Sequence, residues 1–592
     1  MKFKVFLFFY FFLSVTSQAQ NDFDLAKSYF DKGEFEKALY YYKKLNSSQP
    51  RNSKFIFKIV KIYQELEQYN SGELLLKNEL KKTNNPQYLV GLGYNYELQN
   101  KLELSKDYYN LAISRVKSNP AFSYSIALKF EEYSLIDEAI YVYKLAIEKS
   151  KNSSYEYRLA SLYAQKKDIQ NMFISYLNFV EFNPSYLNQT LQILGEYIND
   201  DESSNYNLIL KKIILKKLQS SQNIFWNQML SWLYNNQKDY KKSLLQQKAI
   251  YKREQSSLQQ IISIGLLAKK AKDYETTKSA FNFIIEMSQE PSLILEAKLQ
   301  ILSLDILLKT KEFIRIQSDY LQLIDNYGFN DKTLDLQLSF IDFLVFNLNK
   351  KQDAIDIITN NLKKNFSRFS KAKMKLKLGD IYLLQEKFNL ALIYYTQVYN
   401  EIESGILSQE ARFKVAKTSF YKGDFDWAES QLNILKSSTS KLIANDALEL
   451  QLLIADHKNS DSLDLSLKLY AKADFYLFQN KKSEAFKTLN QVILNYPNSG
   501  IVDQALVSQA KILKSDNKYF EALQKFELVI NNHSSDILID DAYFAAAELC
   551  RLELNFPKKA MKYYEKIIFE FQDSIHFVDS TKHFRDLRND HQ

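Results

Sequence analysis

Histidine is the residue type in this chain best suited to binding a metal ion or moving a proton near neutral pH. The chain has five histidines, all in its last quarter: His457, His533, His576, His583 and His591. His576 and His583 are seven residues apart, so they share one face of a helix. A zinc site needs three or four protein ligands, and no cysteine or carboxylate pattern accompanies this pair. We therefore expect surface histidines and predict no metal site.

Cysteine and paired carboxylates are the next residues that could carry chemistry. Cys550 is the single cysteine, so no disulfide can form within the chain. Its apolar neighbours predict a small buried side chain. The adjacent carboxylates of Glu131 and Glu132, and of Asp540 and Asp541, are typical of solvated helix faces. Neither pair predicts a catalytic site.

Catalytic and phosphate-binding motifs are missing from the sequence. It has no G-x-S-x-G elbow, no G-x-x-x-x-G-K-[ST] loop and no H-E-x-x-H motif. Gly91 and Gly93 lack the third glycine of a dinucleotide-binding loop, and their helical context indicates close helix packing. A catalytic domain needs about 100 residues, and no stretch outside the repeats described below is that long. The sequence therefore predicts a protein that is not an enzyme and has no cofactor.

Glycine and proline are scarce. This scarcity indicates that the elements which position the histidine, cysteine and carboxylate side chains are helices. Only 11 of 592 residues are Gly and 7 are Pro, whereas ordinary proteins carry about 7% and 5%. An all-β sandwich, a collagen-like fibre or a Pro-rich disordered chain needs these residues at many positions. All three classes are excluded. The 41 Tyr and 41 Phe predict a core rich in aromatic rings.

The net charge does not predict a nucleic-acid partner. The formal charge is +8, but the lysines are dispersed in pairs among acidic residues. Blocks of five or more like charges, which are typical of nucleic-acid-binding arms, do not occur.

A short pattern recurs along the chain. A small residue on a predicted helix is followed four residues later by a tyrosine, as at Ala38 and Tyr42 or at Ala391 and Tyr395. The small position, which we call the anchor, recurs mostly at steps of 33 to 38 residues. Longer steps of 71 and 77 residues each leave room for two units. The thirteen anchors are Ala38, Gly72, Ser105, Ala139, Met172, Ser243, Thr277, Ala354, Ala391, Ala428, Ala485, Ala522 and Ala560.

This pattern resembles the tetratricopeptide repeat (TPR) family, whose units contain about 34 residues. Each unit of that family is a pair of antiparallel helices joined by a tight turn. A small residue on the first helix, such as Ala26, Gly93 or Gly379, lets the second helix approach closely. The resemblance implies an all-α solenoid, a right-handed superhelix of stacked helix pairs, with 13 to 15 repeats. The tryptophan that often begins a TPR unit is mostly missing here, and Met172 and Thr277 depart from the usual alanine.

Differences in repeat regularity predict the organisation along the chain. The expected segments are a signal peptide at 1–19, a regular array at 20–184, degenerate repeats at 185–333, an array at 334–436, an irregular connection at 437–465, and final units with a capping helix at 466–592. The final units also resemble those of Gram-negative envelope assembly proteins.

The N-terminal residues predict export. Lys2 and Lys4 precede an apolar run, and Ser17 and Ala19 occupy the positions that a signal peptidase reads. The run is shorter than the roughly 20 residues of a membrane span. Because no cysteine follows it, a lipid anchor is not expected. We expect an exported protein, located in the periplasm of a Gram-negative bacterium.

The first helices of stacked TPR units line a concave face, which in this family binds peptide segments of partner proteins. Six residues on first helices do not carry the packing pattern and are predicted to form such a groove: Tyr94, Glu97, Tyr124, Glu131, Tyr157 and Gln165. The Lys/Asn/Arg set by which chaperone-binding TPR proteins hold a C-terminal carboxylate is not evident. The sequence favours a non-catalytic scaffold or adaptor that binds proteins in the cell envelope. The alternative is a glycan- or nutrient-binding protein of an envelope uptake system, because aromatic rings on such a frame can stack on sugars.

Overall fold

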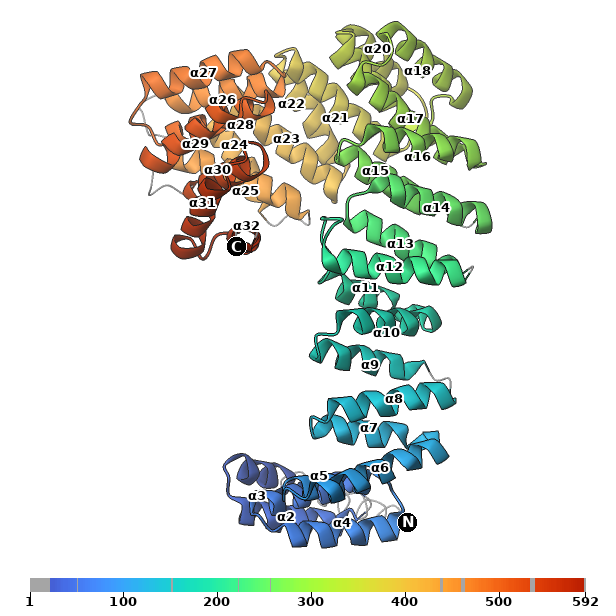
Figure 1. Cartoon of the computed structure of the whole chain (residues 1–592). Helices are drawn as coiled ribbons and strands as arrows, with labels where there is room; N and C mark the ends of the chain where they lie inside the picture. The colour runs from blue at the N-terminus through green and yellow to red at the C-terminus, as the bar shows by residue number, and fades with distance from the viewer. Residues whose placement is uncertain are drawn as a thin grey trace, which may run out of the picture. The chain divides into compact units, whose positions relative to one another are not determined.

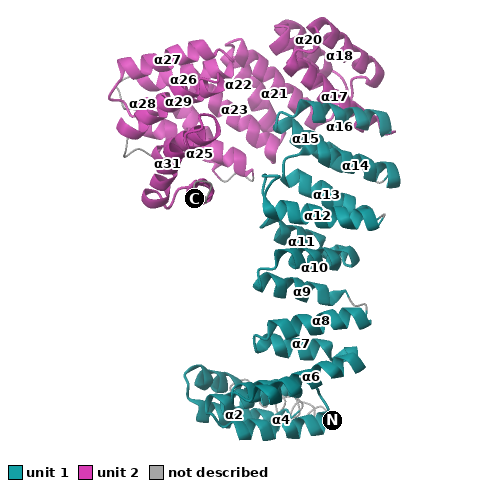
Figure 2. Ribbon diagram, viewed as in Figure 1, with its two compact units in different colours: residues 1–288 teal, residues 289–592 magenta. Residues whose placement is uncertain are grey.

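Helices are the only regular elements in the part of the chain that the structure describes. The computed structural model describes residues 22–50, 52–150, 153–221, 223–255, 257–436, 440–458, 464–532 and 538–589. The predicted signal peptide at 1–19 lies outside these residues. The chain divides into two compact units, one ending at Ser288 and the other beginning at Gln289 (Figure 2).

Unit 1 contains eight successive helix pairs (Figure 1). The first helices of these pairs are residues 22–31, α3 (Ser53–Glu65), α5 (Gln87–Glu97), α7 (Ser123–Glu132), α9 (Ser154–Gln165), α11 (Leu187–Gly195), α13 (Ile224–Asn236) and α15 (Gln259–Lys270). The second helices are α2 (Phe35–Ser48), α4 (Tyr69–Thr83), α6 (Leu102–Ser118), α8 (Ile136–Ser150), α10 (Ile169–Phe182), α12 (Asn205–Ser220), α14 (Tyr240–Glu254) and α16 (Tyr274–Met287). Short 3₁₀ turns, η1 (Pro120–Phe122) and η2 (Pro184–Tyr186), precede α7 and α11.

Unit 2 contains seven further pairs and two additional helices. The first helices are α17 (Pro291–Leu308), α19 (Leu334–Asp342) continued by the π-helix η4 (Phe343–Asn347), α21 (Arg368–Leu384), α23 (Ile406–Lys422), α26 (Leu465–Phe478), α28 (Ile501–Ser515) and α30 (Ile539–Leu552). The second helices are α18 (Phe313–Tyr327), α20 (Lys351–Leu362), α22 (Phe388–Glu401), α24 (Phe425–Leu435), α27 (Lys482–Asn495), α29 (Tyr519–Asn532) and α31 (Pro557–Glu570). The additional helices are α25 (Lys441–His457) and α32 (Phe577–Asn589). The fifteen pairs of the described residues confirm the predicted all-α repeat fold.

Each predicted anchor is the fourth residue of a second helix, and all thirteen are buried. This position faces the first helix of its own pair, where only a small or tightly packed side chain fits. The repeat pattern missed the second helices α12 and α18. In α18 the fourth residue is the buried Ile316, and in α12 the buried residue is Asn207, one position earlier. Neither is one of the small residues that the pattern favours; Met172 of α10 is also larger, but it lies one 33-residue step after Ala139 and four residues before Tyr176, which identified it.

A left-handed residue lies five positions before every one of the thirteen anchors. These residues are Gly33, Glu67, Asn100, Ser134, Lys167, Lys238, Lys272, Asn349, Glu386, Gly423, Asn480, Asn517 and Asn555. At Lys167, for example, φ is 57°, and the amide of Asp168 donates to the carbonyl of Tyr163 at 2.9 Å. That six-to-one bond is the Schellman ending of a helix, and the second helix begins two residues after the left-handed residue. Only two of these positions are glycine, which accounts for part of the glycine scarcity.

Close contact between the helices of a pair depends on the small residue of the first helix, as predicted. A Cβ atom added at Gly93 would overlap the ring of Tyr109, and one added at Gly379 would overlap the ring of Tyr395. Both tyrosines lie four residues after an anchor. In these pairs glycine is therefore required by a ring from the second helix and not by backbone conformation.

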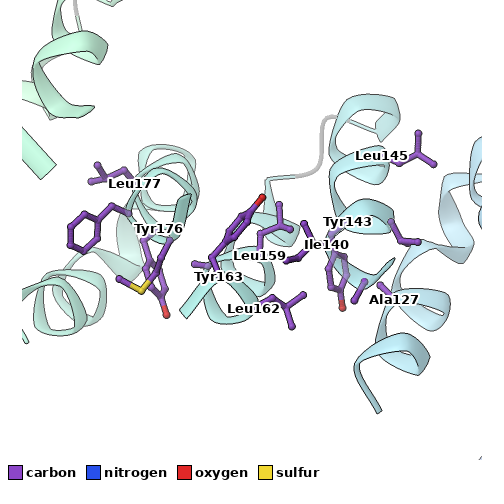
Figure 3. Close-up of a cluster of buried hydrophobic side chains, with 14 of the residues drawn as sticks. Ala127, Ile140, Tyr143, Leu145, Leu159, Leu162, Tyr163, Tyr176 and Leu177 are labelled. Atoms are coloured by element: carbon purple, nitrogen blue, oxygen red, sulfur yellow. The ribbon is translucent and has the colours of Figure 1, made fainter. Parts of the chain in front are cut away.

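One hydrophobic cluster extends from Leu89 to Tyr234 without a break at residue 184. Figure 3 shows part of it, where side chains of α7, α8, α9 and α10 meet, including Ala127, Tyr143 and Leu159. A second cluster, Leu295 to Ile381, spans residue 333, and a third, Ala416 to Ile512, spans the predicted connection at 437–465. The predicted segment boundaries mark changes in how regular the sequence repeat is. The hydrophobic core, in contrast, continues across residues 184, 333 and 437–465.

The predicted irregular connection contains α25. The repeat that follows it packs against helices α21 and α23, which precede α25 in the chain. Lys417 of α23 pairs with Asp474 of α26 at 2.6 Å, and the rings of Tyr421 and Phe475 lie 5.1 Å apart. The side chain of Gln479 donates to the carbonyl of Leu384 at 3.5 Å. Helix α26 therefore lies against the array that precedes α25 in the chain.

Candidate functional site

A cavity of about 570 Å³ in unit 1 opens on the first helices of three successive pairs, α3, α5 and α7. We call it the α3–α5–α7 groove. Its walls are Lys54, Phe57, Lys58, Lys61, Gln64, Glu65, Tyr69, Tyr94, Leu98, Lys129, Glu132 and Tyr133. Four lysines and two glutamates line it, which leaves a formal charge of +2.

Helix α3 presents lysines along one side of the groove. Lys54, Lys58 and Lys61 are spaced by four and three residues, which places them on one helical face, and all three are exposed. The opposite face of α3 buries Ile56, Ile59 and other apolar residues in the core. Among the described residues, no carboxylate lies within ion-pairing distance of these three lysines. The ammonium groups of Lys58 and Lys61 lie 5.3 and 5.4 Å from the ring centre of Phe30.

Lys129 of α7 is a buried cation at the centre of the groove. Only 6% of the residue is exposed, and its ammonium lies 3.6 Å from the ring centre of Phe57. It forms an ion pair with Glu132, one turn further along the same helix. Burial lowers the pKa of the Lys129 ammonium, and the hydrogen bond to Glu132 opposes that shift. Removing a charge from water is costly unless an opposite charge meets it, so this lysine requires an anion.

Two stacked tyrosines form the apolar wall. The rings of Tyr94 and Tyr133 lie 4.1 Å apart and nearly parallel, at 10°. Burial raises the pKa of the Tyr133 phenol, so the hydroxyl stays neutral and can donate a hydrogen bond. The exposed Leu98 extends this wall at the end of α5.

A buried amide fixes the helices that carry the groove. Asn95 of α5 is fully buried and donates to the carbonyl of Tyr69 at 3.0 Å. It also accepts from the Gln64 amide of α3 at 3.3 Å. These bonds join α3, the start of α4, and α5, which sets the distance between the lysines and the tyrosine wall.

The six predicted groove residues have different surroundings. Tyr94 lines the groove, whereas Glu97 and Glu131 accept hydrogen bonds from Tyr109 and Tyr143, each at 2.6 Å. Glu97 and Glu131 thus bind within their own helix pairs. Of the Glu131–Glu132 pair expected on a solvated face, Glu132 is exposed and Glu131 is partly buried.

The other three predicted residues lie on α7 and α9. Tyr124 is 45% exposed, with the Arg158 guanidinium 5.9 Å from its ring centre. Tyr157 packs against Tyr176 and Phe179, and Gln165 is exposed. None of the three is among the residues that line the α3–α5–α7 groove, and their part in binding stays a prediction.

Sequence reasoning missed the charged part of the groove. The lysines of α3 recur at the spacing of one helical face, which is a readable signal. The burial of Lys129 has no such signal, since it depends on Phe57 of α3, two repeats earlier in the chain.

A second cavity, of about 500 Å³, lies in unit 2 among α21, α23, α25 and α26. Its lysines are already neutralised: Lys414 pairs with Asp380 at 2.9 Å, and Lys417 pairs with Asp474. Exposed apolar side chains at its rim include Ile406 and Leu442. The two cavities therefore differ in charge, since the lysines of α3 have no such partners.

His576, just before α32, and His583, within it, make contacts that the sequence did not predict. His576 pairs with Asp541 at 2.7 Å and stacks on Phe544, and His583 lies 4.0 Å from Glu548. Their side chains are 20% and 22% exposed, so both lie at the surface, as expected, but each has a specific acidic neighbour. His533 and His591 lie outside the described residues. Within the described ranges, no three His, Cys, Asp or Glu residues gather as a metal site would require.

Cys550 is buried and free, as predicted. In the part of the chain that the structure covers, no helix has the length and hydrophobicity needed to cross a bilayer.

A family model described as "Tetratricopeptide repeat" matches residues 469–499, which cover most of α26 and α27. A search of curated proteins gives no match. Among solved structures, the APC/C hetero-tetramer Cut9–Hcn1 is similar at 13% identity, covering 96% of this chain and 97% of that one, with a TM-score of 0.22. The Naa15/Naa10 complex bound to HypK is similar at 12% identity, covering 90% and 93%, with a TM-score of 0.28.

Proposed function

Because this chain is a solenoid of tetratricopeptide repeats, we propose that it is a non-catalytic scaffold that binds segments of partner proteins on the first helices of its repeats. The observation that carries the proposal is the α3–α5–α7 groove. It combines exposed lysines, an apolar tyrosine wall and a buried charge, and a polar network holds its helices in place. Interfaces of this kind bind through a few anchoring contacts within a larger complementary surface.

The dimensions of the groove fit a peptide segment. From Lys54 to Lys61, helix α3 advances about 10 Å, at 1.5 Å per residue. An extended peptide covers that length with about three residues. A cavity of about 570 Å³ holds a few side chains, so the groove is large enough to recognise a short sequence.

We place this scaffold in the cell envelope, after export. Support comes from the charged start, the apolar run and the small residues before position 20. Mass spectrometry of the native N-terminus tests this directly. Export with cleavage gives a chain that begins at Gln20, whereas a chain that retains Lys2 and Lys4 contradicts the proposal.

Site-specific photo-crosslinking tests the binding function. A photoreactive benzoyl-phenylalanine replaces Leu98 in the groove and, as a matched control, Leu111 on the second helix α6. The two leucines are 42% and 44% exposed, so their accessibility is nearly equal. The proposal predicts discrete crosslinked proteins for position 98 that are missing at position 111. Identical products at both positions, or none at position 98, would contradict it.

A further inference from the structure

The α3–α5–α7 groove has more lysine side chains than its own carboxylates can neutralise. Lys54, Lys58 and Lys61 form a charged row on α3, and no carboxylate in the described residues pairs with them. The net charge of the groove is +2. In unit 2 the corresponding first helices carry ion pairs from one repeat to the next, as between Lys377 and Asp342 at 2.8 Å. Lys377 and Lys414 of unit 2 thus have carboxylate partners, whereas the lysine row of α3 has none among the described residues.

The two side chains of the Lys129–Glu132 ion pair differ strongly in their exposure to solvent. The lysine side chain is 8% exposed, whereas the side chain of its partner Glu132 is 51% exposed. A buried cation is destabilised when its counter-charge is removed, but the counter-charge does not have to come from the same chain. The Glu132 carboxylate reaches Lys129 from the solvent side, where a carboxylate of a bound molecule could replace it.

The apolar wall of the groove indicates which kind of anionic molecule fits it. Phe57, Tyr94 and Tyr133 place aromatic surface within the same cavity as the four lysines. The sulfates of a sugar chain or the phosphates of a nucleic acid would also use the lysines, and sugars and bases can stack on the tyrosines. The Lys129 pocket favours a carboxylate, because it already holds the carboxylate of Glu132. A peptide that mixes acidic and apolar side chains satisfies both parts of the groove.

We infer that the α3–α5–α7 groove binds an internal acidic segment of a partner protein, with glutamates or aspartates on the lysines and an apolar side chain on the tyrosine wall. In the free protein, Glu132 holds the place of one of the partner's carboxylates. This inference rests on the proposed function and names the chemistry of its partner.

A synthetic peptide and the full-length mature chain provide the test. The probe is a twelve-residue peptide, capped at both ends, with six glutamates around one leucine and one phenylalanine. The caps remove the terminal charges, so only side-chain carboxylates can bind. Fluorescence anisotropy of the labelled peptide should show saturable binding that weakens as salt increases. The same peptide with glutamine in place of every glutamate should bind at least tenfold more weakly.

Variants of the protein locate the site. Replacing Lys54, Lys58 and Lys61 together by glutamine should weaken binding at least tenfold. The matched control replaces three exposed lysines of the second helices α4 and α6, Lys81, Lys106 and Lys117, and changes the net charge equally. Binding to this control should remain within about twofold of the unaltered protein. An equal loss in both triple variants would reduce the effect to net charge and overturn the inference.

Substitution of Glu132 tests whether its carboxylate competes with the peptide for Lys129. Glu132→Gln removes the internal competitor and should tighten peptide binding severalfold, while Lys129→Met should weaken it at least tenfold. Unchanged or weaker binding of Glu132→Gln contradicts the competition. Because Lys129→Met alters a buried site, its circular dichroism spectrum is measured as well, and the α3 triple variant carries the test if folding is impaired.

Two outcomes separate this inference from the proposed function. If position 98 crosslinks to a partner through a segment without acidic residues, the scaffold function stands and the acidic preference fails. If a sulfated oligosaccharide displaces the peptide and binds more tightly, the inference also fails, because the groove would then prefer a sulfated sugar to a peptide carboxylate.

Discussion

Buried tyrosines connect the two helices of several pairs through one polar contact. Tyr109 donates to Glu97, Tyr143 to Glu131 and, in unit 2, Tyr395 donates to Asp380 at 2.7 Å. A buried hydroxyl needs a hydrogen-bond partner, and a carboxylate on the first helix supplies it. Burial raises the pKa of these phenols, and the neighbouring carboxylate raises it further. The hydroxyl therefore stays protonated and acts as a donor.

The Tyr109 ring fits against Gly93 only because glycine has no Cβ atom, and this predicts the effect of a substitution there. In Gly93→Ala the new Cβ would overlap the Tyr109 ring and lie 3.1 Å from the carbonyl oxygen of Ser105. Overpacking of this kind costs about 1–3 kcal/mol, so the urea midpoint of unit 1 should fall. Gly195→Ala is the control, because the nearest atom to its Cβ, on Trp232, is 4.0 Å away. Equal destabilisation by both changes would contradict the packing argument.

The second prediction at this scale concerns pH and the last helix. Burial lowers the pKa of His583 from its ordinary 6.5, and the Arg551 charge lowers it further, while Glu548 and Asp586 raise it and Lys582 lowers it. The folded pKa is below the unfolded one, so protonation favours the unfolded state. The stability that neutral His583 contributes is present above about pH 6.5 and is lost as the pH falls below that value.

Hydrogen exchange in α32 measures this effect. After correction for the intrinsic exchange rate, protection of α32 should decrease between pH 7 and pH 5. His583→Gln should remove most of that dependence, and His576→Gln should retain it. Protection that does not change with pH in the unaltered protein would contradict the prediction.

At the scale of the elements, one turn geometry recurs in thirteen pairs. A residue with positive φ ends the first helix, and the second helix begins two positions later. An L-residue in this conformation costs about 1–2 kcal/mol relative to its usual one. The turn uses asparagine, lysine, glutamate or serine in eleven of the thirteen cases. The protein thus tolerates this strain repeatedly, because the packed pair holds the turn and, in eleven of the thirteen cases, a six-to-one hydrogen bond closes it.

Relieving the strain should stabilise the protein. Lys167→Gly places glycine at a φ of 57°, and after the entropy cost of glycine the net gain should be about 0.5–1 kcal/mol. Gln165→Gly, two residues earlier in α9, puts glycine into a helix and should cost about the same amount. Urea denaturation of both variants gives the comparison. Destabilisation by Lys167→Gly would show that its side chain contributes more than its strained backbone costs.

The turn and the anchors also explain how far the sequence could be interpreted. The thirteen anchors were predictable because a small residue recurs at a fixed step. Gly33 could be assigned to a turn, but nothing in the letters at Lys167 or Glu386 indicates a left-handed residue. Of the predicted groove, Tyr94 lies where expected. The lysine row of α3 was visible only as ordinary surface charge, because its role depends on α7, about seventy residues away.

For the whole chain, a solenoid derives its stability from contacts between neighbouring pairs. Loss of pattern in the sequence therefore does not imply loss of packing. The segment boundary predicted at 184 falls inside the cluster that extends from Leu89 to Tyr234. The two compact units instead separate at Ser288.

Two fragments distinguish these boundaries. A fragment of residues 20–288 retains every contact within unit 1, so we expect native-like helicity and a cooperative urea transition. A fragment of residues 20–184 cuts the cluster and removes Tyr197, whose ring lies 5.8 Å from that of Phe173. It should bind a hydrophobic dye and lose protection against proteolysis in α10. If α10 is equally protected in both fragments, each pair contributes independently of the next, and the boundary at 184 is a true limit of the core. If only the longer fragment is protected, continuity of packing decides where this chain can be divided.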